Sequence, residues 1–198
     1  MNCILSVSHS PQKQGAIYEG ESEYLLSQPI TELVRNIMID DGRSACMIDV
    51  GRDNPKLSYS REVLPRKAKR VNDIASSMAV NSFCCEIHLN SPGSKAGTAV
   101  LYHQDSTTGE RIARRIQSLL EGFMGRGRYW NGQGGVISVP GPFWSSENKR
   151  LTFLSDTEPP AIIIELDSIR FGRWFREHIP FVSMCVANAL GLVCEREQ

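Results

Sequence analysis

Short apolar runs alternate along this chain with longer segments in which apolar residues recur at helical spacing, and this alternation restricts the possible folds more than any other feature. Strands that alternate with helices usually form a mostly parallel sheet covered by helices on both faces. We therefore predict an α/β fold: a single domain over residues 1–198 with a mostly parallel, twisted sheet. The expected strands are 3–8, 45–50, 82–89, 97–102 (at an edge), 151–154 and 161–166, and the expected helices are 22–39, 67–78, 110–122 and 181–192.

The first expected helix has a residue pattern with one irregularity. Ser22 suits the N-cap position, but Pro29 lies inside the segment and lacks the N–H that a helix interior needs. We expect either a kink at Pro29 or a helix that begins closer to it.

The overall charge excludes some classes of partner. The 22 basic and 22 acidic side chains cancel, so net charge does not point to nucleic acid or to an anionic membrane. The basic residues Arg66, Lys67, Lys69 and Arg70 are interpreted as a solvated helix face. The apolar runs are too short to cross a bilayer, and the N-terminal residues lack the features of a secretory signal. We expect a protein that is synthesised in the cytoplasm, binds no nucleic acid and does not insert into a membrane.

Ionisable side chains lie where three of the expected strands end. His9 follows the first strand, His88 closes the strand 82–89 and Glu165 closes the last strand, while Glu23 opens the first helix. In an α/β sheet the carboxyl ends of the strands surround one crevice, where ligands bind. Two histidines and one glutamate would leave a tetrahedral Zn²⁺ with a fourth position open for water, and a further carboxylate would act as the base. The pattern indicates a zinc hydrolase.

Each of these residues also has a less specific interpretation. A single histidine after a strand is commonly a hydrogen-bonded loop residue. Glu165 ends an otherwise apolar run, where a carboxylate is usually paired, metal-bound or functional. Glu19 or Glu21 lies close enough in sequence to replace Glu23 as a ligand. If Glu165 binds the metal instead of acting as the base, Glu86 is the first alternative base.

Residues 125–149 interrupt the alternation and are expected to form a long loop. The segment holds six of the sixteen glycines, and loops of this length are usually functional or disordered. Its aromatic residues Trp130, Phe143 and Trp144 would form either a small local core or a platform beside a cleft. We favour the platform and expect Trp130, Trp144 and Asn90 to contact the substrate.

In this order and spacing the motifs resemble the zinc-dependent N-acetylmuramoyl-L-alanine amidases of the amidase-3 family, and especially bacteriophage endolysins, over nearly the whole chain. The matching motifs are Ser8-His9-Ser10, Ser22-Glu23-Tyr24, Ile87-His88-Leu89-Asn90 and Pro160-Ala161-Ile162-Ile163-Ile164-Glu165. Ser8 stands where the family has glycine. The resemblance implies that His9, Glu23 and His88 bind Zn²⁺ and that Glu165 is the catalytic glutamate.

The function that the resemblance implies is hydrolysis of the amide between N-acetylmuramic acid and L-alanine in peptidoglycan. It further implies one catalytic domain without a separate wall-binding domain, in a phage-type lytic enzyme that acts on the cell wall after release by a pore-forming protein. Two alternatives remain: a zinc peptidase that cleaves the stem peptide of peptidoglycan, and a wall-binding module without catalytic activity.

Overall fold

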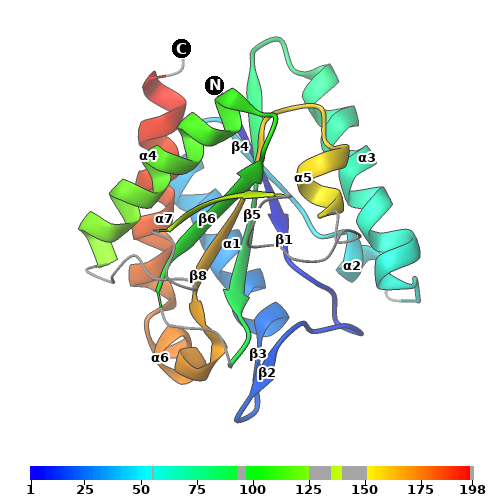
Figure 1. The fold of residues 1–198 in the computed structure, drawn as a ribbon, viewed down its shortest axis with the longest axis vertical. Helices are drawn as coiled ribbons and strands as arrows, with labels where there is room; N and C mark the ends of the chain where they lie inside the picture. The colour runs from blue at the N-terminus through cyan, green and yellow to red at the C-terminus, as the bar shows by residue number, and fades with distance from the viewer. Residues whose placement is uncertain (55, 93–96, 125–134, 140–150, 197–198) are drawn as a thin grey trace.

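A six-stranded sheet forms the centre of the molecule (Figure 1). The computed structural model describes residues 1–54, 56–92, 97–124, 135–139 and 151–196. The strands of the sheet are β1 (Asn2–Val7), β4 (Ala45–Ile48), β5 (Ser82–Asn90), β6 (Ala99–His103), β7 (Val136–Val139) and β8 (Ala161–Ser168). Their spatial order is β4-β1-β5-β8-β6-β7. The first four in this order are parallel, whereas β6 pairs antiparallel with β8 and parallel with β7.

Helices cover both faces of this sheet, which confirms the predicted α/β fold. One face packs against α1 (Glu23–Asp40), α4 (Thr107–Met124) and α7 (Ile179–Arg196), which share one apolar core with the sheet. The other face packs against α2 (Val50–Asp53), α3 (Leu64–Ser77) and α5 (Thr152–Asp156), around a second core. Smaller elements complete the fold: the hairpin β2 (Ile17–Tyr18) and β3 (Glu21–Ser22), the π-helical turn η1 (Tyr59–Val63), the 3-10 turn η2 (Ile169–Phe171), and α6 (Gly172–Glu177).

The helix α1 begins at Glu23, whereas one of the two expected arrangements placed its start near Pro29. The Ser22 hydroxyl accepts a hydrogen bond from the Leu25 N–H at 3.3 Å and caps the helix, so that Glu23 is its first residue. Pro29 lies inside the helix. A helix start near Pro29 was therefore wrong, because the N-terminal cap and the buried residues Leu26 and Ile30 hold the first turns in place.

Three other expectations about the elements were wrong. The strand β6 is internal, because β7 pairs with it from within the segment that was expected to be a loop. Residues Val136–Val139 alternate between partly buried and buried, as a strand covered on one side requires. Residues 151–154 belong mainly to the helix α5, since both Phe153 and Leu154 are buried. An apolar run this short does not distinguish a strand from a helix by its periodicity.

Helix length and composition also bear on membrane crossing. Among the described residues, no single helix is long and apolar enough to span a membrane. The segments Ile169–Glu177 and Ile179–Glu195 reach that length and composition only when taken together, and they meet at an angle of 98°.

Candidate metal centre

The turn after β1 directs His9 toward the first helix. His9 has a φ of 55°, in the left-handed region that residues other than glycine seldom adopt. The preceding Ser8 is fully buried, and its hydroxyl lies 2.7 Å from the Ser27 hydroxyl on α1. The end of β1 is therefore fixed to α1, although Ser8 replaces a glycine of the motif that it resembles.

Three side chains from different parts of the chain converge at this point. Glu23 Oε2 lies 2.8 Å from His9 Nε2, and Glu23 Oε1 lies 2.7 Å from His88 Nδ1. One ligand atom from each residue falls within 4.8 Å of the other two. Two imidazole nitrogens and a carboxylate oxygen are the donor atoms that Zn²⁺ prefers. The chemistry and spacing of this group, which we call the His–Glu–His cluster, therefore fit a zinc ion.

The Glu23 carboxylate is held in place by the backbone as well. The Leu89 N–H donates to Oε1 at 3.2 Å, and the Ala16 N–H donates to Oε2 at 3.1 Å. Burial raises the pKa of Glu23, but hydrogen bonds from His88 and His9 outweigh it and leave the pKa below its usual value. Glu23 is thus a charged, fixed carboxylate.

The two alternative glutamates lie outside the cluster. Glu21 forms an ion pair with Arg176 on α6, and this partner lowers the pKa of Glu21. Glu19 is exposed in the turn of the hairpin and has a φ of 48°. Of these three glutamates, Glu23 is the one that contacts the two histidines.

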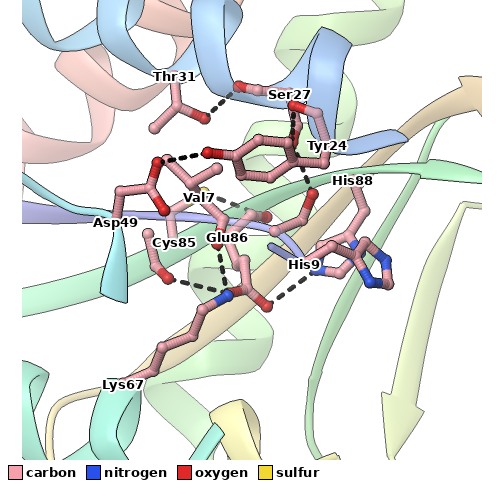
Figure 2. Close-up of polar contacts among 12 residues, drawn as sticks. Val7, His9, Tyr24, Ser27, Thr31, Asp49, Lys67, Cys85, Glu86 and His88 are labelled. Carbon is pink, nitrogen blue, oxygen red and sulfur yellow. Dashed lines mark hydrogen bonds and ion pairs between the residues drawn. The ribbon is translucent and has the colours of Figure 1, made fainter. Parts of the chain in front are cut away.

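The second histidine is held from both sides. His88 Nε2 lies 2.8 Å from Glu86 Oε2, and Lys67 Nζ lies 2.6 Å from the other oxygen of Glu86 (Figure 2). Burial opposes a charge on His88, but the hydrogen bonds to Glu23 and Glu86 raise its pKa to about 10. Lys67 is fully buried, so its interpretation as part of a solvated helix face was wrong.

Glu86 is poorly suited to the role of alternative base. Burial raises its pKa, but the positive charge of Lys67 and the hydrogen bond with His88 lower it to about 2. A carboxylate held charged by two partners accepts a proton reluctantly near neutral pH.

Glu165 lies on β8, the strand that pairs with the His88 strand β5. The Cα positions of the two residues are partners in the parallel register of β5 and β8. Its Oε2 is buried and has no hydrogen-bond partner among the described residues. The pKa of Glu165 is raised to about 7, because burial and the negative charges of Glu23 and Glu86 raise it more than the positive charge of His88 lowers it. A group with this pKa can both accept and return a proton near neutral pH.

Tyr59 also lies at the site, and sequence reasoning missed it. Its ring stacks on the His9 imidazole with centroids 5.5 Å apart and an interplanar angle of 22°. Burial raises the pKa of the Tyr59 hydroxyl, which stays protonated. Tyr59 belongs to the π-helical turn before α3, and no motif in the sequence marks that turn.

The expected substrate-binding residues are only partly described. Asn90 ends β5 two residues beyond His88; it is buried, and its Nδ2 has no hydrogen-bond partner among the described residues. Trp130 and Trp144 lie outside the described residues, as do most residues of the segment 125–149.

Gly15 packs directly against the cluster, so we expect an alanine there to disturb it. A Cβ atom on Gly15 would lie 2.4 Å from Glu23 Oε2 and 2.5 Å from His9 Cδ2. Gly15→Ala should therefore weaken zinc binding about tenfold or more, comparable with the loss of a group that orients a ligand. Gly42→Ala is the matched control, because Gly42 has the same φ of +76° and nothing within 4 Å of the added Cβ.

Both alanine variants should lose about 1–2 kcal/mol of stability from the left-handed backbone. Zinc affinities measured by competition with a chelator separate the two effects. Equal affinities for the two variants would contradict the close packing of Gly15 against the cluster.

The raised pKa of His88 predicts how the zinc-depleted protein responds to pH. The pKa of about 10 in the folded protein lies above the usual histidine pKa of 6.5, so the stabilising effect of His88 is complete below pH 6.5 and is lost as the pH rises through about 10. We expect urea unfolding of chelator-treated protein to show lower stability at pH 9.5 than at pH 6.5. The same comparison with His88→Asn should show a smaller decrease, and an equal decrease would contradict the role of His88.

The described residues thus define an α/β domain with a His–Glu–His cluster beside the carboxyl ends of β1 and β5. No protein-family model and no curated protein matches the chain. Solved structures do resemble it. The N-acetylmuramyl-L-alanine amidase Ami1 from Mycobacterium smegmatis has a TM-score of 0.73 at 13% identity, covering 98% of this chain and 97% of that one.

Two further solved structures are similar over nearly their full length. The N-acetylmuramoyl-L-alanine amidase from Clostridium difficile 630 has a TM-score of 0.70 at 15% identity, covering 96% of this chain and 94% of that one. The amidase AmiC2 of Nostoc punctiforme has a TM-score of 0.69 at 17% identity, covering 100% of this chain and 98% of that one. At such identities the likeness shows that the fold is shared.

Proposed function

We propose that this protein is a zinc-dependent N-acetylmuramoyl-L-alanine amidase, which hydrolyses the amide between N-acetylmuramic acid and L-alanine in peptidoglycan. The observation that carries the proposal is the His–Glu–His cluster together with Glu165 on the adjacent strand, whose buried Oε2 has no hydrogen-bond partner among the described residues. The sequence motifs and the fold shared with solved amidases support the same function.

The residues of the site have separate roles in this reaction. His9, Glu23 and His88 would hold Zn²⁺, which supplies Lewis acidity and lowers the pKa of water to about 7. Glu165 accepts the proton of the attacking water as the water oxygen bonds to the carbonyl carbon. It then donates that proton to the departing nitrogen of L-alanine as the C–N bond breaks. Its pKa of about 7 suits both transfers.

The domain organisation follows from the same reasoning. The His–Glu–His cluster combines residues from the turn after β1, from α1 and from β5, and Glu165 lies beside it on β8, so we propose that residues 1–198 act as a single catalytic domain. A buried glutamate with a raised pKa also favours an enzyme over a module that only binds the wall.

Activity on isolated cell walls tests the proposed function. Purified protein loaded with zinc should reduce the turbidity of a peptidoglycan suspension, lose that activity on treatment with a chelator, and regain it when zinc is added. Metal analysis should find about one zinc per chain. Zinc-loaded protein with no effect on peptidoglycan from several bacterial types would contradict the proposal.

We further propose a phage-type lytic role, which is supported by the sequence resemblance to endolysins. In this role the protein is made in the cytoplasm and reaches the cell wall through a separate pore-forming protein. Expression in bacteria should then cause lysis only when a pore-forming protein is expressed with it. Lysis without that partner would contradict this part of the proposal.

A further inference from the structure

A lysine is among the largest fully buried side chains of this protein. Lys67 extends from α3 beneath the end of β1, where its Nζ donates to the Val7 carbonyl and to Glu86 Oε1 (Figure 2). Glu86 is 2% exposed, and its Oε1 also accepts a hydrogen bond from the Ser6 hydroxyl at 2.9 Å. The Lys67 ammonium group and the Glu86 carboxylate therefore form an ion pair that is almost completely buried.

Stability alone does not account for this pair. Removing two charges from water is costly, and apolar residues of similar volume are often equally stabilising at such a position. The residues next to Glu86 on β5, which are Cys84, Cys85 and Ile87, are buried and apolar, so an apolar side chain could also be accommodated at this position. The pair is better explained by a contact that an apolar side chain could not make.

That contact is with the histidine of the cluster. Glu86 Oε2, the oxygen that does not face Lys67, lies 2.8 Å from His88 Nε2. His88 Nδ1 faces Glu23, so it is the nitrogen on the side of the cluster. A neutral imidazole carries its proton on one nitrogen only. With the proton on Nε2, the lone pair of Nδ1 is free to bind a metal.

The two histidines of the cluster differ in this respect. The nitrogen of His9 that does not face Glu23, Nδ1, is buried but has no hydrogen-bond partner among the described residues. Within the described part of the chain, His88 is the one of the two with a carboxylate at its second nitrogen, and that carboxylate is itself held by Lys67 and Ser6. The polar contacts behind His88 thus form a continuous series from α3 to the cluster.

We propose that Lys67 and Glu86 form a positioning pair, which holds the Nε2–H of His88 and leaves its Nδ1 available for zinc. The inference rests on the proposed function, because it concerns the metal of that site. Neither Lys67 nor Glu86 touches the substrate; both act through His88.

Two double variants separate this role from a structural one. Lys67→Met/Glu86→Leu removes both charges together with the acceptor for His88. Lys67→Met/Glu86→Gln removes the same charges but keeps an amide oxygen that can accept from Nε2–H and an amide nitrogen that can donate to Ser6. Zinc dissociation constants from competition with a chromophoric chelator are compared with the melting temperatures of the zinc-depleted proteins.

The leucine variant should bind zinc about 10–100-fold more weakly than the wild type, as is typical when the partner of a ligating histidine is lost. The glutamine variant should recover most of that affinity, although both variants lack the ion pair. Equal zinc affinities in the two variants and the wild type would overturn the inference and leave the proposed function intact. Failure of the wild type itself to bind zinc would instead contradict the proposed function.

A measurement on the unaltered protein keeps the inference testable if the variants do not fold. Long-range ¹H–¹⁵N spectra of histidine-labelled protein report which nitrogen of each of the four histidines carries a proton. In the zinc-loaded protein His88 should be protonated at Nε2 and bound to metal at Nδ1. Protonation at Nδ1 would overturn the inference.

Discussion

Replacing Glu165 by glutamine is expected to remove nearly all hydrolysis of peptidoglycan while leaving the fold and the bound zinc in place. Glutamine has the size of glutamate but cannot take the proton of the attacking water. General acid–base catalysis contributes about 10²–10⁴-fold, so the residual turnover should be at or below about 1% of the wild type. Turnover is measured as new amino groups released from purified peptidoglycan, and zinc by metal analysis of the same sample.

The matched control for this variant is Glu158→Gln, the same substitution at an exposed position that precedes β8 and is not part of the His–Glu–His cluster. It should keep full activity. Turnover above about a tenth of the wild type in Glu165→Gln would contradict the role of general base. Loss of zinc in Glu165→Gln would show that Glu165 is a ligand, and the base would then have to be another residue.

Replacing His88 by alanine is expected to abolish zinc binding at stoichiometric concentrations. The change removes one of three ligands and also leaves Glu23 and Glu86 without their shared partner. The loss of affinity should exceed the roughly 10–100-fold that follows when only the partner of a ligand is lost. Addition of zinc should therefore raise the melting temperature of the wild type but not that of the variant.

The control for this second variant is His103→Ala, because His103 lies at the end of β6 and is not part of the cluster. It should bind zinc with the affinity of the wild type. Full zinc occupancy in His88→Ala would show that this residue does not bind the metal. The variant His88→Asn retains a polar side chain and serves for the same measurement if the alanine variant unfolds.

Much of the fold could be predicted from the sequence because its strands are short apolar runs with clear ends. The parallel strands β1, β5 and β8 carry His9, His88 and Glu165 at or near their carboxyl ends, and parallel pairing places those ends on one edge of the sheet. The structure accordingly brings His9 and His88 together with Glu23. Their roles as ligands, and that of Glu165 as the base, stay predictions that the variants above test.

Other features could not be predicted because they depend on tertiary contacts. Lys67 belongs to a helix segment rich in basic residues, and only the position of α3 against β1 shows that this one lysine is buried. Tyr59 reaches His9 from a π-helical turn without a sequence signature. The strand β7 exists because β6 offers a free edge for it to pair with, and four residues are too few to predict a strand from periodicity.

Mass spectrometry of peptidoglycan digested by the zinc-loaded protein tests the proposed function most directly. The products of an amidase are free stem peptides that begin with an unblocked L-alanine, together with glycan strands whose N-acetylmuramic acid carries no peptide. We predict these products from the wild type and their absence from Glu165→Gln. Shortened peptides that remain attached to the glycan would contradict the account and identify a zinc peptidase, and intact muropeptides alone would identify a protein that binds the wall without cleaving it.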